Sequence, residues 1–464
     1  MKRLILLSAL ALTLSACTDY LNVKPKGYDI ASRIEHYSGL LYGTDLALMD
    51  ITFPYMCMEC HTDEDGYGNA YSTVGSHVCN AYKWLTDIYR EDQTCGEWNS
   101  FTTLLYNYNV IIAEVMDAAN GTEEEKQAIQ AEARMLRAWC TFMMSSFFGE
   151  VPIIRVASTM DNDFSLCSVE EVNAFILKEM EESVPQLSNA EEHYLRIFQP
   201  TGYGLYGKIL FMMGRYEEAA VQLQQCRELL KSQPSIHLTD YRPLMDAGGD
   251  INYNVQADVN PEKMFYVMGM PRLWDSVYAS LYNQLMFGVR NDLLERFFPD
   301  RKDCRLAFHS SVSTGVSAYK KYVASQTYAA NMSNIVTNMG LDLSEVYTML
   351  AECLARAGKT DEAAALLVEL RTNRMDEGHE GIPADVVSAD DYVRFAFSER
   401  MREQFGFGTS WFDMKRLWGD PLFQDLKPLY IHTLGSESFA FTQDNLYLHY
   451  PPTVLAWHPE YVNQ

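Results

Sequence analysis

Apolar residues spaced three and four positions apart dominate this chain and predict helices. Residues 98–116 follow this spacing, as expected for a helix that packs along one face. A second helix is predicted for residues 122–148, because Thr122 and Glu125 have the spacing of a capping box. The same signature opens a third periodic stretch, residues 168–187. These segments predict a mostly α-helical protein.

Two later segments match each other in the placement of their small residues and indicate an internal repeat. The matching positions are Gly207, Gly214, Tyr216 and Ala219 in the first segment and Ala351, Gly358, Thr360 and Ala363 in the second. Tetratricopeptide-like helix pairs have this skeleton, because small side chains let two antiparallel helices approach closely. Together with the earlier helices, these segments predict a scaffold of about four helix pairs.

Two long regions, residues 55–97 and 231–340, lack clear periodicity and are rich in Gly, Asn, Asp, Ser and Tyr. They are expected to form long ordered loops and short strands on one face of the scaffold. Loops of this length usually carry binding. The helical scaffold is expected in residues 98–230 and 341–420, within a single domain that covers residues 17–464.

The N-terminus has the features of a lipoprotein export signal. Met1-Lys2-Arg3 is positively charged, and the apolar run that follows is too short to span a bilayer. The run ends in Leu14-Ser15-Ala16-Cys17, the spacing that a lipoprotein signal peptidase requires. Residues 1–16 are therefore predicted to be removed and Cys17 to be lipidated, which would anchor the protein to a membrane. The alternative is an ordinary secretory signal with an incidental cysteine.

Acidic residues outnumber basic ones by 62 to 37, which gives a formal net charge of -25. Removal of Lys2 and Arg3 with the signal would lower it further. Such a charge disfavours nucleic acids and polyanionic glycans as ligands, and it favours neutral, cationic or zwitterionic ones.

Three local motifs suggest bound metals or cofactors, but each has a simpler explanation. Cys57, Cys60, Cys79 and Cys95 lie near His61 and His77, yet their spacing and the exported compartment favour disulfides or buried thiols over zinc. Residues 202–207 match a dinucleotide fingerprint without the strand that should precede it. Residues 63–69 resemble part of a calcium loop without its bidentate acid. No cofactor or metal is expected.

Several segments, taken in order and spacing, resemble the SusD/RagB family along nearly the whole mature chain. The most recognisable are Ala131-Glu132-Ala133-Arg134-Met135-Leu136-Arg137-Ala138 and Phe147-Phe148-Gly149-Glu150-Val151-Pro152. The others are residues 17–25, Trp98 with Tyr106 and residues 109–111, residues 292–294 with Asp303 and Arg305, residues 345–352, residues 399–400 with 411–416, residues 450–452 and residues 459–460. Asp342 departs from the family, which often has an arginine there, and this puts one buried salt bridge in doubt.

The resemblance implies a non-catalytic lipoprotein on the outer face of the outer membrane. Such a protein would lie over a TonB-dependent, SusC-like barrel, bind oligosaccharide, and release it into the pore. Capture of peptides by the same scaffold is an alternative. A surface glycoside hydrolase is a further one, but it would need two carboxylates about 5 to 9.5 Å apart and the sequence contains no motif for them. No catalytic residue is therefore assigned.

Aromatic and polar residues in the two irregular regions are the candidates for ligand binding. The aromatic candidates are Tyr67, Tyr71, Tyr82, Trp84, Trp274 and Tyr278, and the polar candidates are Asp63, Asn69, Asn283 and Arg290. Sugar rings stack their C–H faces on aromatic rings, and polar side chains bond their hydroxyls. Alternatively, these aromatic residues cover a satellite core beneath the loops.

Overall fold

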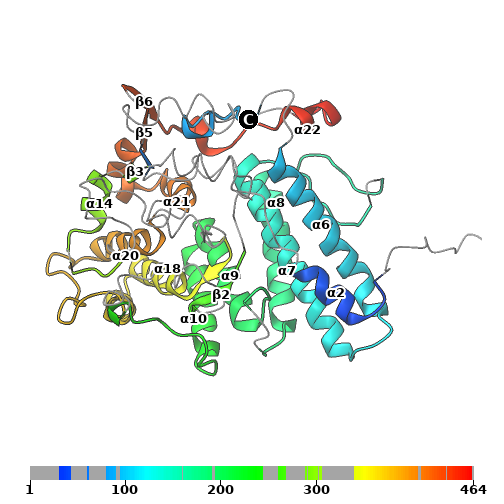
Figure 1. Ribbon diagram of the computed structural model, residues 1–464, viewed down its shortest axis with the longest axis horizontal. Coiled ribbons are helices and arrows are strands. Elements are labelled where there is room, and N and C mark those ends of the chain that lie inside the picture. The colour runs from blue at the N-terminus through cyan, green and yellow to red at the C-terminus, as the bar shows by residue number, and fades with distance from the viewer. Residues whose placement is uncertain are drawn as a thin grey trace, which may run out of the picture.

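The computed structural model describes residues 31–42, 60–61, 80–89, 95–158, 160–190, 194–243, 260–267, 288–289, 291–300, 302–305, 339–405, 409–434 and 436–461. Most of them are helical (Figure 1), as the sequence predicts. The helices of the first half are α2 (Ile34–Leu41), α6 (Gly96–Glu114), α7 (Glu123–Phe148), α8 (Val169–Ser183), α9 (Gln199–Met212) and α10 (Tyr216–Leu230). Those of the second half are α14 (Asn291–Phe297), α18 (Leu343–Arg356), α19 (Thr360–Thr372), α20 (Ala389–Gln404), α21 (Ser410–Leu417) and α22 (Pro452–Trp457).

Short antiparallel strand pairs lie beside this scaffold. β1 (Cys60–His61) pairs with β3 (Gly288–Val289), β2 (Lys263–Phe265) with β4 (Leu341–Asp342), and β5 (Ile431–Leu434) with β6 (Glu437–Ala440). The 3-10 turns are η1 (Val115–Asp117), η2 (Val184–Gln186), η4 (Pro421–Leu429) and η5 (Gln443–Leu446).

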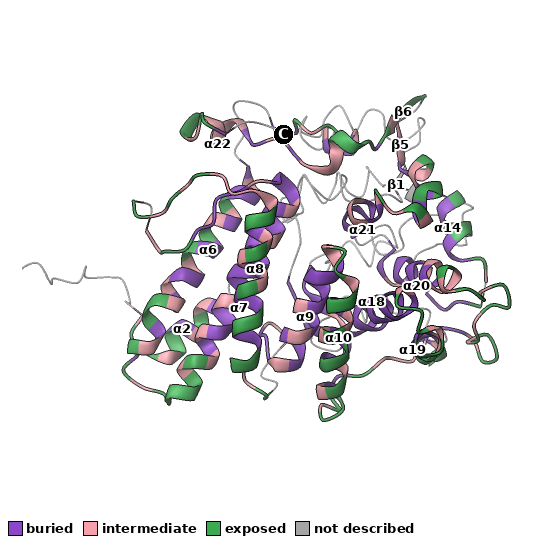
Figure 2. Cartoon of the chain, turned by 180° about the vertical axis from the view of Figure 1, so that it is seen from behind, coloured by how far each residue is buried: buried purple, intermediate pink, exposed green. Residues whose placement is uncertain are grey.

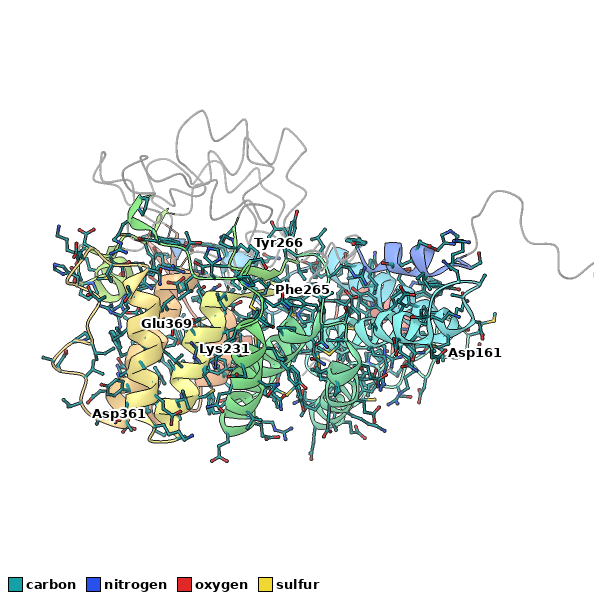
Figure 3. All side chains as sticks on the ribbon, turned by 90° about the horizontal axis from the view of Figure 1, so that it is seen from below. Asp161, Lys231, Phe265, Tyr266, Asp361 and Glu369 are labelled. Carbon is teal, nitrogen blue, oxygen red and sulfur yellow. The ribbon has the colours of Figure 1, made fainter. Side chains whose placement is uncertain are left out.

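The long helices stand side by side, as Figure 3 shows from below. α7 packs between α6 and α8, α9 packs on α10, and α18 contacts α10, α19 and α20. The predicted capping boxes are present: Glu125 N–H donates to the Thr122 hydroxyl, and Glu171 N–H to the Ser168 hydroxyl. Each helix therefore begins at the position that the sequence indicates.

The internal repeat is reproduced in backbone conformation. Gly214 and Gly358, which lie two residues after the ends of α9 and α18, have φ values of 75° and 74°. The next residues, Arg215 and Lys359, also agree, with φ, ψ of −87°, 63° and −88°, 59°. At Gly207 an added Cβ would lie 2.6 Å from Leu223 Cγ, so α9 and α10 approach too closely there for a larger side chain.

The core runs between the two halves of the chain, and its buried faces point inward in Figure 2. Phe147 at the end of α7 stacks on Trp411 of α21, with ring centroids 4.8 Å apart. Lys415 Nζ donates to the Ser146 carbonyl oxygen at 2.5 Å and lies 3.9 Å from the Tyr447 ring centroid. Burial lowers the pKa of Lys415 well below its ordinary value. These contacts join the end of α7 to the C-terminal half.

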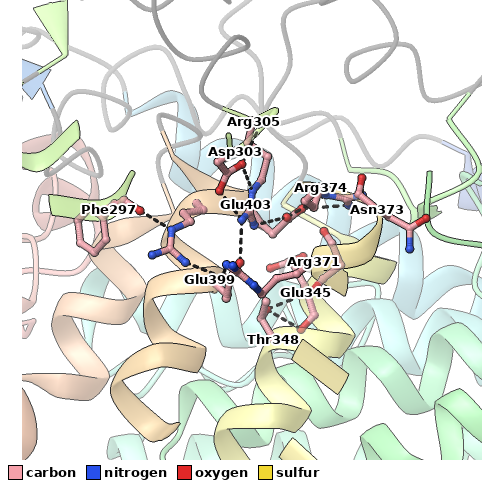
Figure 4. Close-up of polar contacts among 12 residues, drawn as sticks. Phe297, Asp303, Arg305, Glu345, Thr348, Arg371, Asn373, Arg374, Glu399 and Glu403 are labelled. Carbon is pink, nitrogen blue, oxygen red and sulfur yellow. Dashed lines mark hydrogen bonds and ion pairs between the residues drawn. The ribbon is translucent and has the colours of Figure 1, made fainter. Parts of the chain in front are cut away.

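A network of buried charges occupies the C-terminal half (Figure 4). Glu399 of α20 accepts from Arg371 at 2.6 Å and from Arg402 at 2.5 Å, and it lies 2.8 Å from Arg305. Burial alone would raise the pKa of the Glu399 carboxyl, but the three guanidinium groups hold it far below its usual range. This carboxylate is therefore charged in the folded protein, and three cations share it.

We predict that Glu399→Gln lowers the free energy of unfolding by about 3–5 kcal/mol, because it removes the charged partner of the buried Arg371 and Arg402 guanidinium groups. Urea unfolding of the purified protein measures this. The matched control is Glu362→Gln on the exposed face of α19, where the Lys359–Glu362 pair spans 3.7 Å and is more than half exposed. The control should change the free energy by less than about 0.5 kcal/mol. Equal effects of the two substitutions would contradict the prediction.

Candidate functional site

The two irregular regions meet at the β1–β3 strand pair. Cys60 pairs with Val289 and His61 with Gly288. β1 also contacts β5, so a third segment from near the C-terminus joins the same place. Regions that are more than 200 residues apart in the sequence thus converge at one edge of the scaffold.

A stack of three aromatic rings is built beside this junction. The His432 ring of β5 lies 4.5 Å from the Tyr82 ring and 3.7 Å from the Trp84 ring, with interplanar angles of 11° and 21°. His432 Nδ1 lies 2.6 Å from the Tyr82 carbonyl oxygen, which can only accept, so this nitrogen carries a proton. Tyr82 donates its hydroxyl to the Thr433 carbonyl oxygen at 2.7 Å. The stack fixes the 80–89 segment to the β5–β6 hairpin.

Trp84 is held in an unusual backbone conformation. Its φ of 53° is the only positive value at a non-glycine residue in the described ranges. A bulky residue in the left-handed region costs roughly 1–2 kcal/mol, so the surroundings must offset it. The Asn445 amide donates to the Trp84 carbonyl oxygen at 2.5 Å, and Phe441 packs edge-on at 5.4 Å. Asn445 therefore holds the backbone of Trp84, while His432 and Phe441 pack against its ring.

Of the aromatic residues proposed for ligand binding, the structure describes Tyr82 and Trp84. Both are buried, with exposed fractions of 0% and 1%, so neither ring offers a face to solvent. For these two, burial favours the alternative interpretation of a satellite core beneath loops. The other predicted residues lie outside the described ranges: Tyr67, Tyr71, Trp274, Tyr278, Asp63, Asn69, Asn283, Arg290 and the predicted lipidation site Cys17.

Neither His432 nor the hairpin that carries it was predicted from the sequence. His432 is about 350 residues from its stacking partners, and a lone histidine has no motif. The available sequence signal for a hairpin was Gly435 between two short apolar–polar stretches, because glycine is common in hairpin turns. Trp418, which lies 4.4 Å from Lys427 Nζ and packs on Phe441, was also missed.

The motifs that suggested metals or cofactors have structural roles where they are described. Cys95 is a free, buried thiol whose sulfur accepts from the Trp98 N–H at 3.3 Å and so caps α6. Residues 202–207 lie inside α9, where an added Cβ at Gly204 would lie 2.5 Å from Leu341. Among the described residues, no group of three or more His, Cys, Asp or Glu side chains is placed to hold a metal ion. Cys57 and Cys79 lie outside the described ranges.

The search for membrane-spanning helices gives a negative result for the described residues: no helix there has both the length and the apolar character to cross a bilayer.

Comparison with known structures identifies the fold. A SusD superfamily protein from Bacteroides thetaiotaomicron aligns with a TM-score of 0.69 and 18% identity, over 93% of this chain and all of that one. A laminarin-binding SusD-like protein aligns with a TM-score of 0.67 and 17% identity, over 92% of this chain and 98% of that one. Surface glycan-binding protein A from Bacteroides uniformis gives 0.66 and 16%, with the same coverage. At these identities the likeness concerns the fold.

Two family models match the sequence itself. Residues 54–210 match a SusD-like family described as starch-binding and associating with the outer membrane, and residues 307–454 match the SusD family. No curated protein shows significant sequence similarity to the chain. The two matched stretches together make up well over half of the chain, and they agree with each other and with the fold. The chain belongs to the SusD/RagB-like family.

Proposed function

We propose that this protein captures an oligosaccharide at the cell surface and delivers it to a TonB-dependent transporter in the outer membrane. The observation that carries the proposal is the match to two family models, one of them described as starch-binding and associating with the outer membrane. Relatives of the same fold are named for binding laminarin and for binding surface glycans. Members of the family are carbohydrate-binding proteins and not enzymes, so no catalytic step is assigned.

The physical properties of the chain agree with a neutral glycan as the ligand. A formal net charge of -25 repels polyanions but does not hinder neutral sugars. The irregular regions supply aromatic rings for stacking and Asp, Asn and Arg side chains for hydroxyl groups. The β1–β3 pair joins these regions, since β1 directly precedes the segment with Tyr67 and Tyr71, and β3 follows the segment with Trp274.

We predict that Trp274→Ala weakens oligosaccharide binding by about 1–3 kcal/mol, the usual range for a well-packed anchor residue. Calorimetry on the mature chain with Cys17→Ala, titrated with starch- and laminarin-derived oligosaccharides, measures the loss. Trp457→Ala is the control, because Trp457 is 86% exposed on α22, which lies on the other side of the molecule from β3 in Figure 1. Trp84→Ala should instead lower the free energy of unfolding by about 3–5 kcal/mol, as expected for a buried tryptophan.

An unchanged affinity in Trp274→Ala, with an unchanged melting temperature, would place the glycan site elsewhere. Binding of peptides in place of all tested oligosaccharides would favour the peptide alternative. Peptide capture relies more on backbone hydrogen bonds, so removal of an aromatic side chain should weaken it less.

We predict that Cys17→Ala releases the protein from the outer membrane, because a diacylglycerol on this residue would provide the anchor. Each buried methylene adds about 0.8 kcal/mol, so several acyl chains hold firmly. Fractionation of cells followed by immunoblotting measures the distribution, with Cys304→Ala as a control at another cysteine. A variant that stays with the membranes as fully as the parent would show that the anchor lies elsewhere.

We predict that the protein co-purifies with a TonB-dependent barrel from detergent-solubilised outer membranes. A tethered binding protein without a membrane-spanning segment needs a partner to move a solute inward. Affinity purification of the tagged lipoprotein, followed by mass spectrometry, tests this. Recovery of the lipoprotein without any barrel, in a detergent that keeps other outer-membrane complexes intact, would count against delivery but not against glycan binding.

A further inference from the structure

A cleft with a volume of about 660 Å³ lies between α2, the first turns of α7, residues 186–190 and residues 196–198. It is within the range of about 300–1,000 Å³ that is typical of small-molecule sites. In Figure 1 α2 lies at the opposite end of the scaffold from β5 and β6, so this cleft is separate from the junction described above.

The floor of the cleft is a rigid, buried ion pair. Arg196 donates to both carboxylate oxygens of Glu132 at 2.6–2.9 Å, and its remaining nitrogen donates to the Ser38 hydroxyl at 2.6 Å. The Glu132 carboxylate also accepts from the Ile197 N–H at 2.8 Å. Because these charges neutralise each other, the floor presents no net charge to a ligand.

One wall carries an aromatic ring that is open to solvent. Tyr42, which follows α2, is 42% exposed, and its ring lies 5.3 Å from the guanidinium carbon of Arg196. The neighbouring wall is smooth: an added Cβ at Gly39 would meet no atom within 4 Å. An exposed aromatic ring with free space beside it can stack on the flat C–H face of a sugar ring.

The rim offers hydrogen-bonding groups and carboxylates but no lysine. Glu124 and the Asn189 side-chain amide make no hydrogen bond or ion pair within the described part of the chain, so both remain available to a ligand. Ser188 and Gln186 line the same edge. Carboxylates and amides without a free cation exclude anions and suit the hydroxyl groups of a neutral saccharide.

A second cleft of about 610 Å³ lies between α10, α18 and α19, but its charged groups are not available to a ligand. Its charged groups pair with one another: Arg227 with Glu369 at 3.0 Å and Lys231 with Glu228 at 2.5 Å, beside the Glu369 and Lys231 labelled in Figure 3. Tyr347 donates to Glu369 at 2.5 Å, so its hydroxyl is occupied too. A ligand there would have to break existing pairs, which the cleft beside α2 does not require.

We infer that the cleft beside α2 is a second saccharide-binding site, which takes a short stretch of a neutral glycan by stacking on Tyr42 and by hydrogen bonds to Glu124 and Asn189. The inference rests on the proposed function, because it assigns a further site for the same class of ligand. It adds a binding site at the end of the scaffold away from the β1–β3 junction.

The test uses Gly39, because this residue lines the cleft and an added Cβ there meets no atom within 4 Å. Gly39→Phe should block the site, and Gly39→Ala should leave it open; both remove a glycine from α2, so neither should lower the melting temperature. The mature chain with Cys17→Ala is first screened on an array of neutral oligosaccharides that includes maltoheptaose and laminariheptaose. Calorimetry with the best binder then gives the number of sites and their affinities.

The parent and Gly39→Ala should bind two saccharides per chain, and Gly39→Phe should bind one. Tyr42→Ala should weaken the cleft site about five- to tenfold, and the change should persist in a Trp274→Ala background. If Gly39→Phe binds like the parent, the cleft inference is wrong and the proposed function stands. If the parent binds none of the neutral oligosaccharides on the array, both are wrong.

Discussion

Buried charge is the constraint on which the C-terminal half of this protein depends. A guanidinium group removed from water costs several kcal/mol unless carboxylates surround it, so each buried arginine dictates where its partners lie. Arg374 has two such carboxylate partners: Nη2 donates to Glu262 at 2.8–2.9 Å, and Nε donates to Glu403 at 3.0 Å. Arg305, fully buried, bonds Asp303 and Glu403. These pairs fix α20 against residues 260–267 and 302–305.

The same ion-paired scaffold also holds the irregular region that carries the proposed binding residues. The β2–β4 pair holds residues 260–267, inside the second irregular region, beside residues 339–342, where that region ends. The Lys208 ammonium of α9 donates to Glu345 at 2.8 Å and to the Gly340 carbonyl oxygen at 2.7 Å, so the first repeat is tied to the same point. A loop region with both ends fixed to a rigid scaffold can vary in sequence without loss of the fold. The stability of the fold therefore depends on the scaffold, whereas ligand specificity would depend on the loop region.

Much of the scaffold could be predicted from the sequence because its signals are local. Thr122 with Glu125, and Gly214 with Gly358, act on their own neighbours in the chain, so their spacing reveals helix starts and turns. The ion pairs could not be predicted in this way. At Asp342 the family pattern suggested a lost salt bridge, yet Asp342 pairs with Lys263 at 2.7 Å, because β2 lies beside β4. Likewise, the burial of Tyr82 and Trp84 depends on His432, which only the fold brings between them.

Two saccharide sites at opposite ends of the scaffold would change how a polymer is held. Once one stretch of a glycan is bound, the second site meets the same chain at an effective concentration set by the glycan between them. Each site could then be weak and quickly exchanging, which release into a transporter requires, while the polymer as a whole stays at the surface. Short oligosaccharides cannot span both sites and would gain nothing. The α2 helix also follows the predicted tether: Asn120 accepts from the Ile34 N–H at 3.0 Å and donates to Glu35, which holds this end in place. The cleft would then lie at the end of the scaffold from which the chain leads back to the predicted lipidation site, Cys17.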